Sequence, residues 1–251
     1  FPPKEVLSGS GTGSEKNSDQ SSAIRGGAGA GGSTVISGSP RTFVVTETGE
    51  GDAFLLLEAI RLMNPGDKIE LKKGTYSLLI GHLSVPDFEI AGEGEGTLIE
   101  LPETLKLGQQ NLTFRNLKLA NTSTGPLVEI RNNKKLTLHG VELQGNGNDC
   151  VSISNGQVVA NDLKVQRCNR GILIKANSTA QISGISISDS DYGIFLEGET
   201  SQLITRLKAE NINLFSVFFS SGSAGNITCV SCTLTDNATN RKARLILKSA
   251  P

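Results

Sequence analysis

Short apolar strands recur along the chain from Thr97 onward at an almost constant interval. Cutting the sequence before each strand gives six segments of 21 to 29 residues: 97–125, 126–149, 150–170, 171–192, 193–215 and 216–239. A fixed period in this range is typical of a solenoid, in which each repeat stacks on its neighbours. Helical repeats would need about 33 residues or more and a helical periodicity, which these segments lack.

Within each segment, apolar and polar residues alternate. Alternate residues of a strand point to opposite faces, so the apolar pairs are expected to face inward and to stack from coil to coil. The pairs of the first strand are Val128 and Ile130, Val151 and Ile153, Ile172 and Ile174, Ile194 and Leu196, and Val217 and Phe219. A second set runs from Leu112 and Phe114 to Ile227 and Cys229, and a third from Leu117 and Leu119 to Cys232 and Leu234.

One position between the second and third strands is restricted to a few residue types. It is occupied by Asn116, Gly140, Asp162 and Gly184 in four successive coils. Glycine, asparagine and aspartate adopt positive φ at low cost. The sequence therefore predicts a sharp left-handed corner at the same place in each coil.

The region before the coils has two parts. Residues 1–41 are rich in Gly and Ser and poor in large apolar residues, which predicts a flexible arm, either a spacer or a terminus without a role. Residues 52–63 have apolar residues at helical spacing, with Asp52 as a suitable N-cap and Pro65-Gly66 as a stop. We expect residues 42–251 to form one domain with this helix as its cap.

The helix, the segment PGDKIELKKGTY and the coils from Thr97 together resemble the right-handed parallel β-helix, or pectin-lyase-like, superfamily over roughly residues 43–250. The resemblance implies an all-β solenoid of about 7–8 coils with an N-terminal capping helix. It also implies a polysaccharide as the partner, because the superfamily's enzymes hold an acidic polysaccharide along the outer face of one sheet. The fold hosts lyases, hydrolases and non-catalytic proteins, so it does not decide the activity.

Three short segments are similar to motifs of the polygalacturonase-type hydrolases. They are Asn148 to Ile153, Asn169 to Ile172, and Arg206 to Lys208. The motif is incomplete, since Asn148 stands where that family has a second carboxylate and Arg170 where it has a histidine. Inverting hydrolysis needs both an acid and a base, so we do not expect this reaction.

The candidate catalytic residues are Asp149, Arg170 and Asp191, which precede the first strands of successive coils. Coils stack about 4.8 Å apart, so the two carboxylates would lie about 10 Å apart with the arginine between them. That is near the upper limit for an inverting pair. The alternative is an ordinary ladder of charges on a solvated turn.

The outward column of the first strand reads Glu129, Ser152, Leu173, Phe195 and Phe218. Its three large apolar residues, flanked by Tyr192, Lys175 and Glu197, predict an exposed patch for a polysaccharide or a protein. Two alternatives remain: the arm or the C-terminal tail covers the patch, or a second copy of the chain packs on it.

Four cysteines fall into two pairs. Cys150 and Cys168 lie at neighbouring turns, where a disulfide is geometrically possible and would suit an oxidising compartment. Cys229 and Cys232 fall in inward columns, which favours buried thiols or a local bond over zinc. We expect no metal and no cofactor.

Five N-x-S/T sequons are present, at Asn111, Asn121, Asn177, Asn226 and Asn237. In a secreted eukaryotic protein these would accept glycans. Asparagine and threonine are also common in β-helix turns, and we favour this second interpretation from the sequence alone.

Composition and charge exclude several functional classes. The chain has 29 Gly, no Trp and a net charge of −1, and its Lys and Arg form no stripe of the kind that binds nucleic acid. No apolar run is long enough to span a membrane. It opens on Phe1 without a basic and apolar leader, which we interpret as a processed or trimmed chain. We therefore expect an extracellular, periplasmic or cell-surface protein with a non-catalytic binding or structural role. The alternative is a polysaccharide lyase or glycoside hydrolase.

Overall fold

The structure is a computed structural model that describes residues 39–48, 51, 55–79, 87–220, 225–234 and 244–248. It contains one helix, α1 (Leu56–Leu62), and nineteen strands in these residues. The strands are β1 (Thr42–Val45), β2 (Lys68–Leu71), β3 (Gly74–Ser77), β4 (Phe88–Gly92), β5 (Thr97–Leu101), β6 (Leu105–Leu107), β7 (Leu112–Arg115), β8 (Lys118–Asn121), β9 (Val128–Ile130), β10 (Lys135–His139), β11 (Glu142–Gln144), β12 (Val151–Ile153), β13 (Gln157–Gln166), β14 (Arg170–Ile174), β15 (Thr179–Leu196), β16 (Thr200–Phe219), β17 (Gly225–Val230), β18 (Thr233–Leu234) and β19 (Arg244–Lys248). The arm predicted over residues 1–41 falls almost entirely outside this part of the chain.

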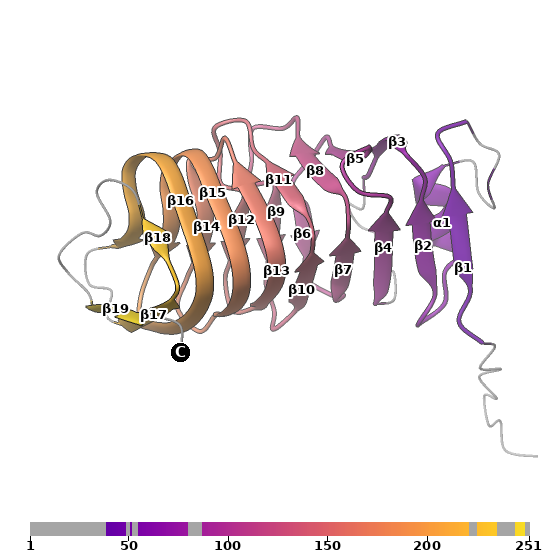
Figure 1. The fold of residues 1–251 in the computed structure, drawn as a ribbon. Coiled ribbons are helices and arrows are strands. Elements are labelled where there is room, and N and C mark those ends of the chain that lie inside the picture. Colours follow the sequence, from indigo (N-terminus) through magenta and orange to yellow (C-terminus); the bar gives the residue numbers. More distant parts are fainter. Residues whose placement is uncertain are drawn as a thin grey trace, which may run out of the picture. The chain divides into compact units, whose positions relative to one another are not determined.

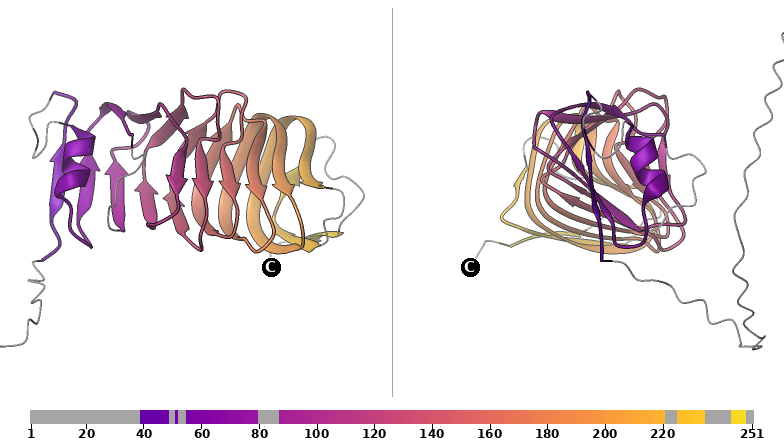
Figure 2. Two further views of the ribbon diagram at one scale, coloured as in Figure 1. Left: turned by 180° about the vertical axis from the view of Figure 1, so that it is seen from behind. Right: turned by 90° about the vertical axis from the view of Figure 1, so that its right-hand side faces the viewer.

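The strands form a right-handed parallel β-helix, as the sequence predicts (Figure 1). Three parallel sheets run along the stack, and the end-on view in Figure 2 shows the coils superimposed around one core. The first sheet contains β6, β9, β12, β14 and the last parts of β15 and β16. The second begins with β1, β2, β4, β7 and β10, and the third with β3, β5, β8 and β11. The long strands β13, β15 and β16 turn corners and so belong to more than one sheet.

The predicted inward columns are confirmed where their side chains are described, which leaves out Ile227 and Cys229; at the end of the third column, Cys232 and Leu234 are only partly buried. In the first sheet Val151 pairs with Val128 on one side and Ile172 on the other, and the column continues through Ile194 to Val217. All of these side chains are fully buried. Burying an aliphatic side chain of this size stabilises the fold by about 1.5–3 kcal/mol, so the columns are the main source of its stability.

One inward position of the second sheet holds a polar residue. Gln202 lies in register with Ile227 and is buried. Its Oε1 accepts a hydrogen bond from the Ala180 amide at 2.7 Å, and its Nε2 donates to the Ser178 carbonyl at 3.0 Å. Both ends of the amide are therefore satisfied, which makes burial tolerable.

The corner between the second and third sheets has the predicted conformation. The φ angles are 49° at Asn116, 60° at Gly140, 52° at Asp162 and 74° at Gly184. The column then continues with residue types that the sequence did not suggest, Arg206 at 55° and Ser231 at 55°. Stacking on the preceding coils thus imposes the left-handed conformation even where the residue does not favour it.

The helix α1 buries Leu56, Ala59 and Ile60 and lies beside the first strands (Figure 2). Its N-cap is Leu55, which makes no side-chain capping bond. The predicted cap, Asp52, lies outside the described residues. The helix ends at Leu62, shortly before Pro65-Gly66, as expected.

A buried carboxylate anchors this end of the solenoid. Asp67 is only 3% exposed. It accepts hydrogen bonds from the amides of Asn64 and Arg41, each at 2.8 Å, and from the Arg41 guanidinium at 2.9 and 3.2 Å. The two amide bonds, helped by the guanidinium, lower the pKa of Asp67. Arg41 also lies over the Phe43 ring, 4.7 Å from its centroid, so the end of the predicted arm is bound to the folded domain.

Candidate binding face

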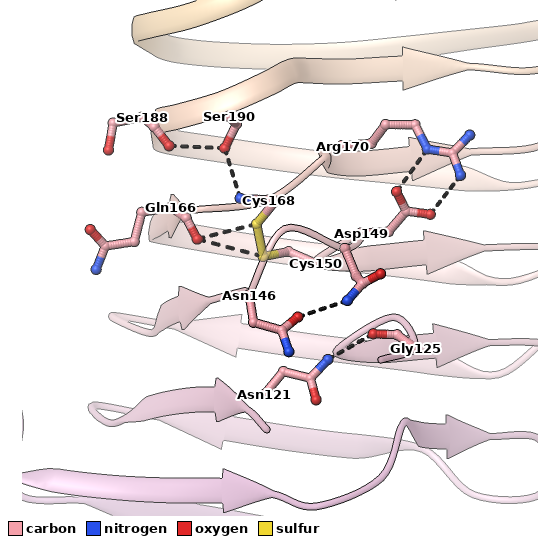
Figure 3. The surroundings of a disulfide bond; sticks show 11 residues. Asn121, Gly125, Asn146, Asp149, Cys150, Gln166, Cys168, Arg170, Ser188 and Ser190 are labelled. Carbon is pink, nitrogen blue, oxygen red and sulfur yellow. Dashed lines mark hydrogen bonds and ion pairs between the residues drawn. A yellow bond between two sulfur atoms is a disulfide. The ribbon is translucent and has the colours of Figure 1, made fainter. Parts of the chain in front are cut away.

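Two of the candidate catalytic residues form an ion pair on the first sheet. Arg170 opens β14, and Asp149 precedes β12 in the coil before it. Arg170 Nε and Nη2 each donate to one Asp149 oxygen at 2.7 Å (Figure 3). This two-pronged contact with Asp149 is the main reason why the pKa of Arg170 is raised. Both oxygens of the largely buried Asp149 are therefore engaged.

The third candidate, Asp191, does not share this pair. The second carboxylate on Arg170 is Glu197, whose Oε1 lies 3.4 Å from Nη1. Asp191 instead accepts a hydrogen bond from Asn213 Nδ2 at 2.8 Å. It lines a separate groove of about 620 Å³ together with Arg167 and other polar residues. The ladder expected from the sequence thus runs Asp149, Arg170, Glu197.

Four aromatic residues form a cluster beside Arg170, and we call them the aromatic cluster: Tyr192, Phe195, Phe215 and Phe218. All four are half-buried. The closest rings are those of Phe195 and Phe218, with centroids 4.6 Å apart. The Tyr192 ring meets the Phe195 ring edge-on at 5.0 Å.

The guanidinium of Arg170 joins the ion pair to the aromatic cluster. It lies 5.0 Å from the centroid of the Phe195 ring, a distance at which a cation is attracted to an aromatic face. Phe195 and Phe218 are in register on neighbouring coils, as are Tyr192 and Phe215. Phe215 was missed in the sequence because it lies outside the alternating column, near the irregularity at Ser190 and Tyr192.

The exposed patch predicted from the sequence is wrong at one end. Leu173 is only 2% exposed, and Ser152 beside it is also buried. Leu173 is flanked along the stack by Ser152 and Phe195. Its outward position in the strand therefore does not make it part of an exposed patch. Lys175 and Glu197 are half-buried at the ends of their strands.

A disulfide joins Cys150 to Cys168 beside the ion pair (Figure 3). The two Cα atoms are 5.7 Å apart, within the usual range. Both cysteines are buried, and the Gln166 carbonyl oxygen lies 3.3 Å from the Cys168 sulfur. The bond ties together the turns that hold Asp149 and Arg170.

The second pair of cysteines is described only in part. Cys232 packs half-buried against the core and is disulfide-bonded; the side chain of Cys229 lies outside the described residues. Among the residues with known positions, no group of three or more His, Cys, Asp or Glu could hold a metal ion. No helix in the same residues is long and apolar enough to cross a membrane.

A larger groove, of about 850 Å³, lies on the corner between the second and third sheets. Residues of the loop after β4 line it, together with Lys118 and Glu142. Lys164 and Glu95 form an ion pair of 3.4 Å between residues 69 positions apart, although both are well exposed. The sequence pattern does not indicate this groove, because the groove depends on a loop longer than the one-residue corners that follow.

Comparisons with known proteins agree with this architecture. A crystal structure of the pectate lyase Pel9A has a similar fold, with a TM-score of 0.51 and 11% identity over 85% of this chain and 77% of that one. No curated protein matches the chain. The family model described as "Right handed beta helix region" matches residues 106–245, more than half of the sequence. The chain therefore belongs to the right-handed β-helix family.

Proposed function

We propose that the chain is a non-catalytic protein that binds a polysaccharide on the outer face of its first sheet. The observation that carries this proposal is the aromatic cluster, which spans two neighbouring coils and stays half-exposed beside charged side chains. Aromatic rings with polar neighbours suit sugars, which have apolar faces and hydroxyl edges. The solved structure with a similar fold is a pectate lyase, and this likeness supports a polysaccharide as the ligand.

The ion pair favours binding over catalysis. A general acid or base must reach the proton that it transfers. The two Asp149 oxygens instead accept hydrogen bonds from Arg170, which also contacts Glu197. These three side chains are better suited to hold the aromatic cluster in place and to offer hydrogen bonds at its edge.

The charges on the face favour a neutral polysaccharide over a polyuronate. Arg170 is balanced by Asp149 and Glu197, and Glu129 pairs with Arg131 at 2.6 Å. A chain of uronates would need an excess of cations to bind strongly. On this face Lys175 has no ion-pair partner among the described residues, and one lysine supplies little of that excess.

Affinity electrophoresis against neutral and uronate polysaccharides tests the proposal. The Phe195→Leu variant keeps an apolar side chain but removes the ring, so binding should weaken about two- to ten-fold, the usual worth of one aromatic contact. Leu203→Ser is the matched control, because Leu203 is 55% exposed on the second sheet, away from the cluster. Equal binding by the wild type and Phe195→Leu would contradict the proposed face. New reducing ends or unsaturated products would contradict the non-catalytic role.

A further inference from the structure

The sequon asparagines differ in whether their side-chain amides form hydrogen bonds within the fold. The side chains of Asn111, Asn121 and Asn177 are described, while those of Asn226 and Asn237 are not. N-glycosylation replaces a hydrogen on Nδ2 by a sugar, so the folded protein can carry a glycan only where Nδ2 projects into open solvent. This requirement applies to each of the three described sequons.

Two of the three asparagines use their amides within the fold. Asn111 Nδ2 donates to Asp87 Oδ2 at 2.8 Å, and its Oδ1 accepts from the Lys135 amide at 2.9 Å. Asn121 is 7% exposed. Its Nδ2 donates to the Gly125 carbonyl and its Oδ1 accepts from the Ser123 amide, both at 2.7 Å. A sugar on either nitrogen would displace these contacts.

Asn177 is in the opposite situation. It is exposed at the turn after β14, with φ of 60°, and no hydrogen bond to its side chain is found in the described part of the chain. The middle residue of the sequon, Ser178, is buried: its hydroxyl donates to the Ile153 carbonyl and accepts from the Asn155 amide. The third residue, Thr179, is exposed again. Ser178 thus anchors the turn while Asn177 and Thr179 face outward.

The neighbouring coils place no large side chain over this turn. The residue before Asn177 is Ala176, and the residue that packs against it from the next coil is Gly198, which has no side chain. Even a Cβ at Gly198 would lie 2.8 Å from the Ala176 Cβ. Asn155 and Glu199, which occupy the corresponding turns on either side, are themselves exposed. No described side chain therefore closes over the Asn177 amide.

We propose that Asn177 is an N-glycosylation site. In the transfer, Nδ2 attacks C1 of a lipid-linked glycosyl diphosphate, the C1–oxygen bond breaks, the lipid diphosphate leaves with the electron pair, and Nδ2 loses a proton. The buried Cys150–Cys168 disulfide fits passage through an oxidising compartment, where this transfer takes place. The glycan would stand two residues beyond Lys175, at the rim of the binding face. The inference does not depend on what that face binds.

The test is to express the full chain in the secretory pathway of a eukaryotic cell line. The glycans are then released enzymatically in heavy-oxygen water, and the labelled asparagines are mapped by mass spectrometry. We expect a label at Asn177 and none at Asn111 or Asn121. Asn177→Asp, which tolerates the same backbone conformation, should remove one glycan, as should Thr179→Ala, whereas Thr179→Ser should keep it. An unlabelled Asn177, or a label at Asn111 or Asn121 in the folded protein, would overturn the proposal.

Discussion

The same three-residue arrangement occurs twice in the solenoid, with different surroundings. At the N-terminal end Arg41 pairs with Asp67 and lies over Phe43; in the central coils Arg170 pairs with Asp149 and lies over Phe195. Asp67 also accepts two backbone hydrogen bonds, whereas both hydrogen bonds found for the Asp149 carboxylate in the described residues come from Arg170. The first pair is thus built into the backbone of a turn. The second depends on one side chain at the edge of a surface.

The largest expected effect concerns the disulfide, which supports only the central pair. Replacing both Cys150 and Cys168 by Ala should lower the free energy of unfolding by about 3 kcal/mol, because the bond closes a loop of 18 residues. Urea denaturation gives the change. Hydrogen exchange should also quicken at the Cys150 amide, which bonds to the Arg170 carbonyl at 3.0 Å.

The comparison supplies the control for that experiment. Exchange at the Asp67 amide, bonded to the Asn64 carbonyl at 3.0 Å, should be unchanged under conditions that favour local opening. Equal acceleration at both amides would mean that the two pairs are not independent.

The second effect is a difference in the loss of folding stability when each of the two aspartates is replaced. Asp67→Asn should cost about 2 kcal/mol, because charge-assisted hydrogen bonds to a buried carboxylate are lost. Asp149→Asn should cost about 1 kcal/mol less, since Asp149 has two of these bonds where Asp67 has four. Parallel chemical denaturation measures both. A larger loss for Asp149→Asn would reverse our assignment of the anchoring role.

The third effect is a difference in the loss of folding stability when each of the two arginines is replaced by lysine. Arg170→Lys should cost about 1 kcal/mol, because an ammonium cannot reproduce the two-pronged contact with Asp149. Arg41→Lys should cost less, since the Asn64 and Arg41 amides still hold Asp67. Thermal unfolding of the two variants side by side measures the difference, and equal losses would contradict it.

The smallest effect is a pH dependence of stability at the N-terminal pair. The pKa of Asp67 is lowered in the folded state, so its carboxylate stabilises the protein above the unfolded value of about 3.9. That contribution is lost as the pH falls through the lower folded-state pKa. The stability difference between wild type and Asp67→Asn should therefore narrow below about pH 4. A difference that stays constant down to pH 2 would contradict the assigned shift.

The sequence predicted the inside of the molecule better than its outside. The inward columns follow from strict alternation, because burial favours apolar side chains there, and the corner at Asn116 follows from the residues that tolerate positive φ. The burial of Gln202 could not be predicted from this alternation, because the two hydrogen bonds that satisfy its amide, with Ala180 and Ser178, involve a neighbouring coil.

The outer face of the first sheet was harder to predict, because the exposure of each residue there depends on how its neighbours' side chains are oriented. The pattern places Leu173 outward, but the structure shows that it is only 2% exposed. The spacing of Asp149, Arg170 and Asp191 suggested one ladder, while the structure has Glu197 as the second partner of the arginine. The partner of a long flexible side chain depends on its neighbours in three dimensions, and the repeat period of the sequence does not specify these neighbours.

The single-residue corner between the second and third sheets has a consequence for how such a chain can change in evolution. An insertion of one residue at Gly140 or Asp162 would turn every following side chain of that strand to the other face, so these corners admit substitutions, including Arg206, but not added length. The loop after β4, which connects the same two sheets, is the exception, and there the extra residues line a groove. Duplication or deletion of a whole coil leaves the corner intact, since each coil packs only on its neighbours. Genes of this family should therefore differ by complete coils and by loops at the other turns.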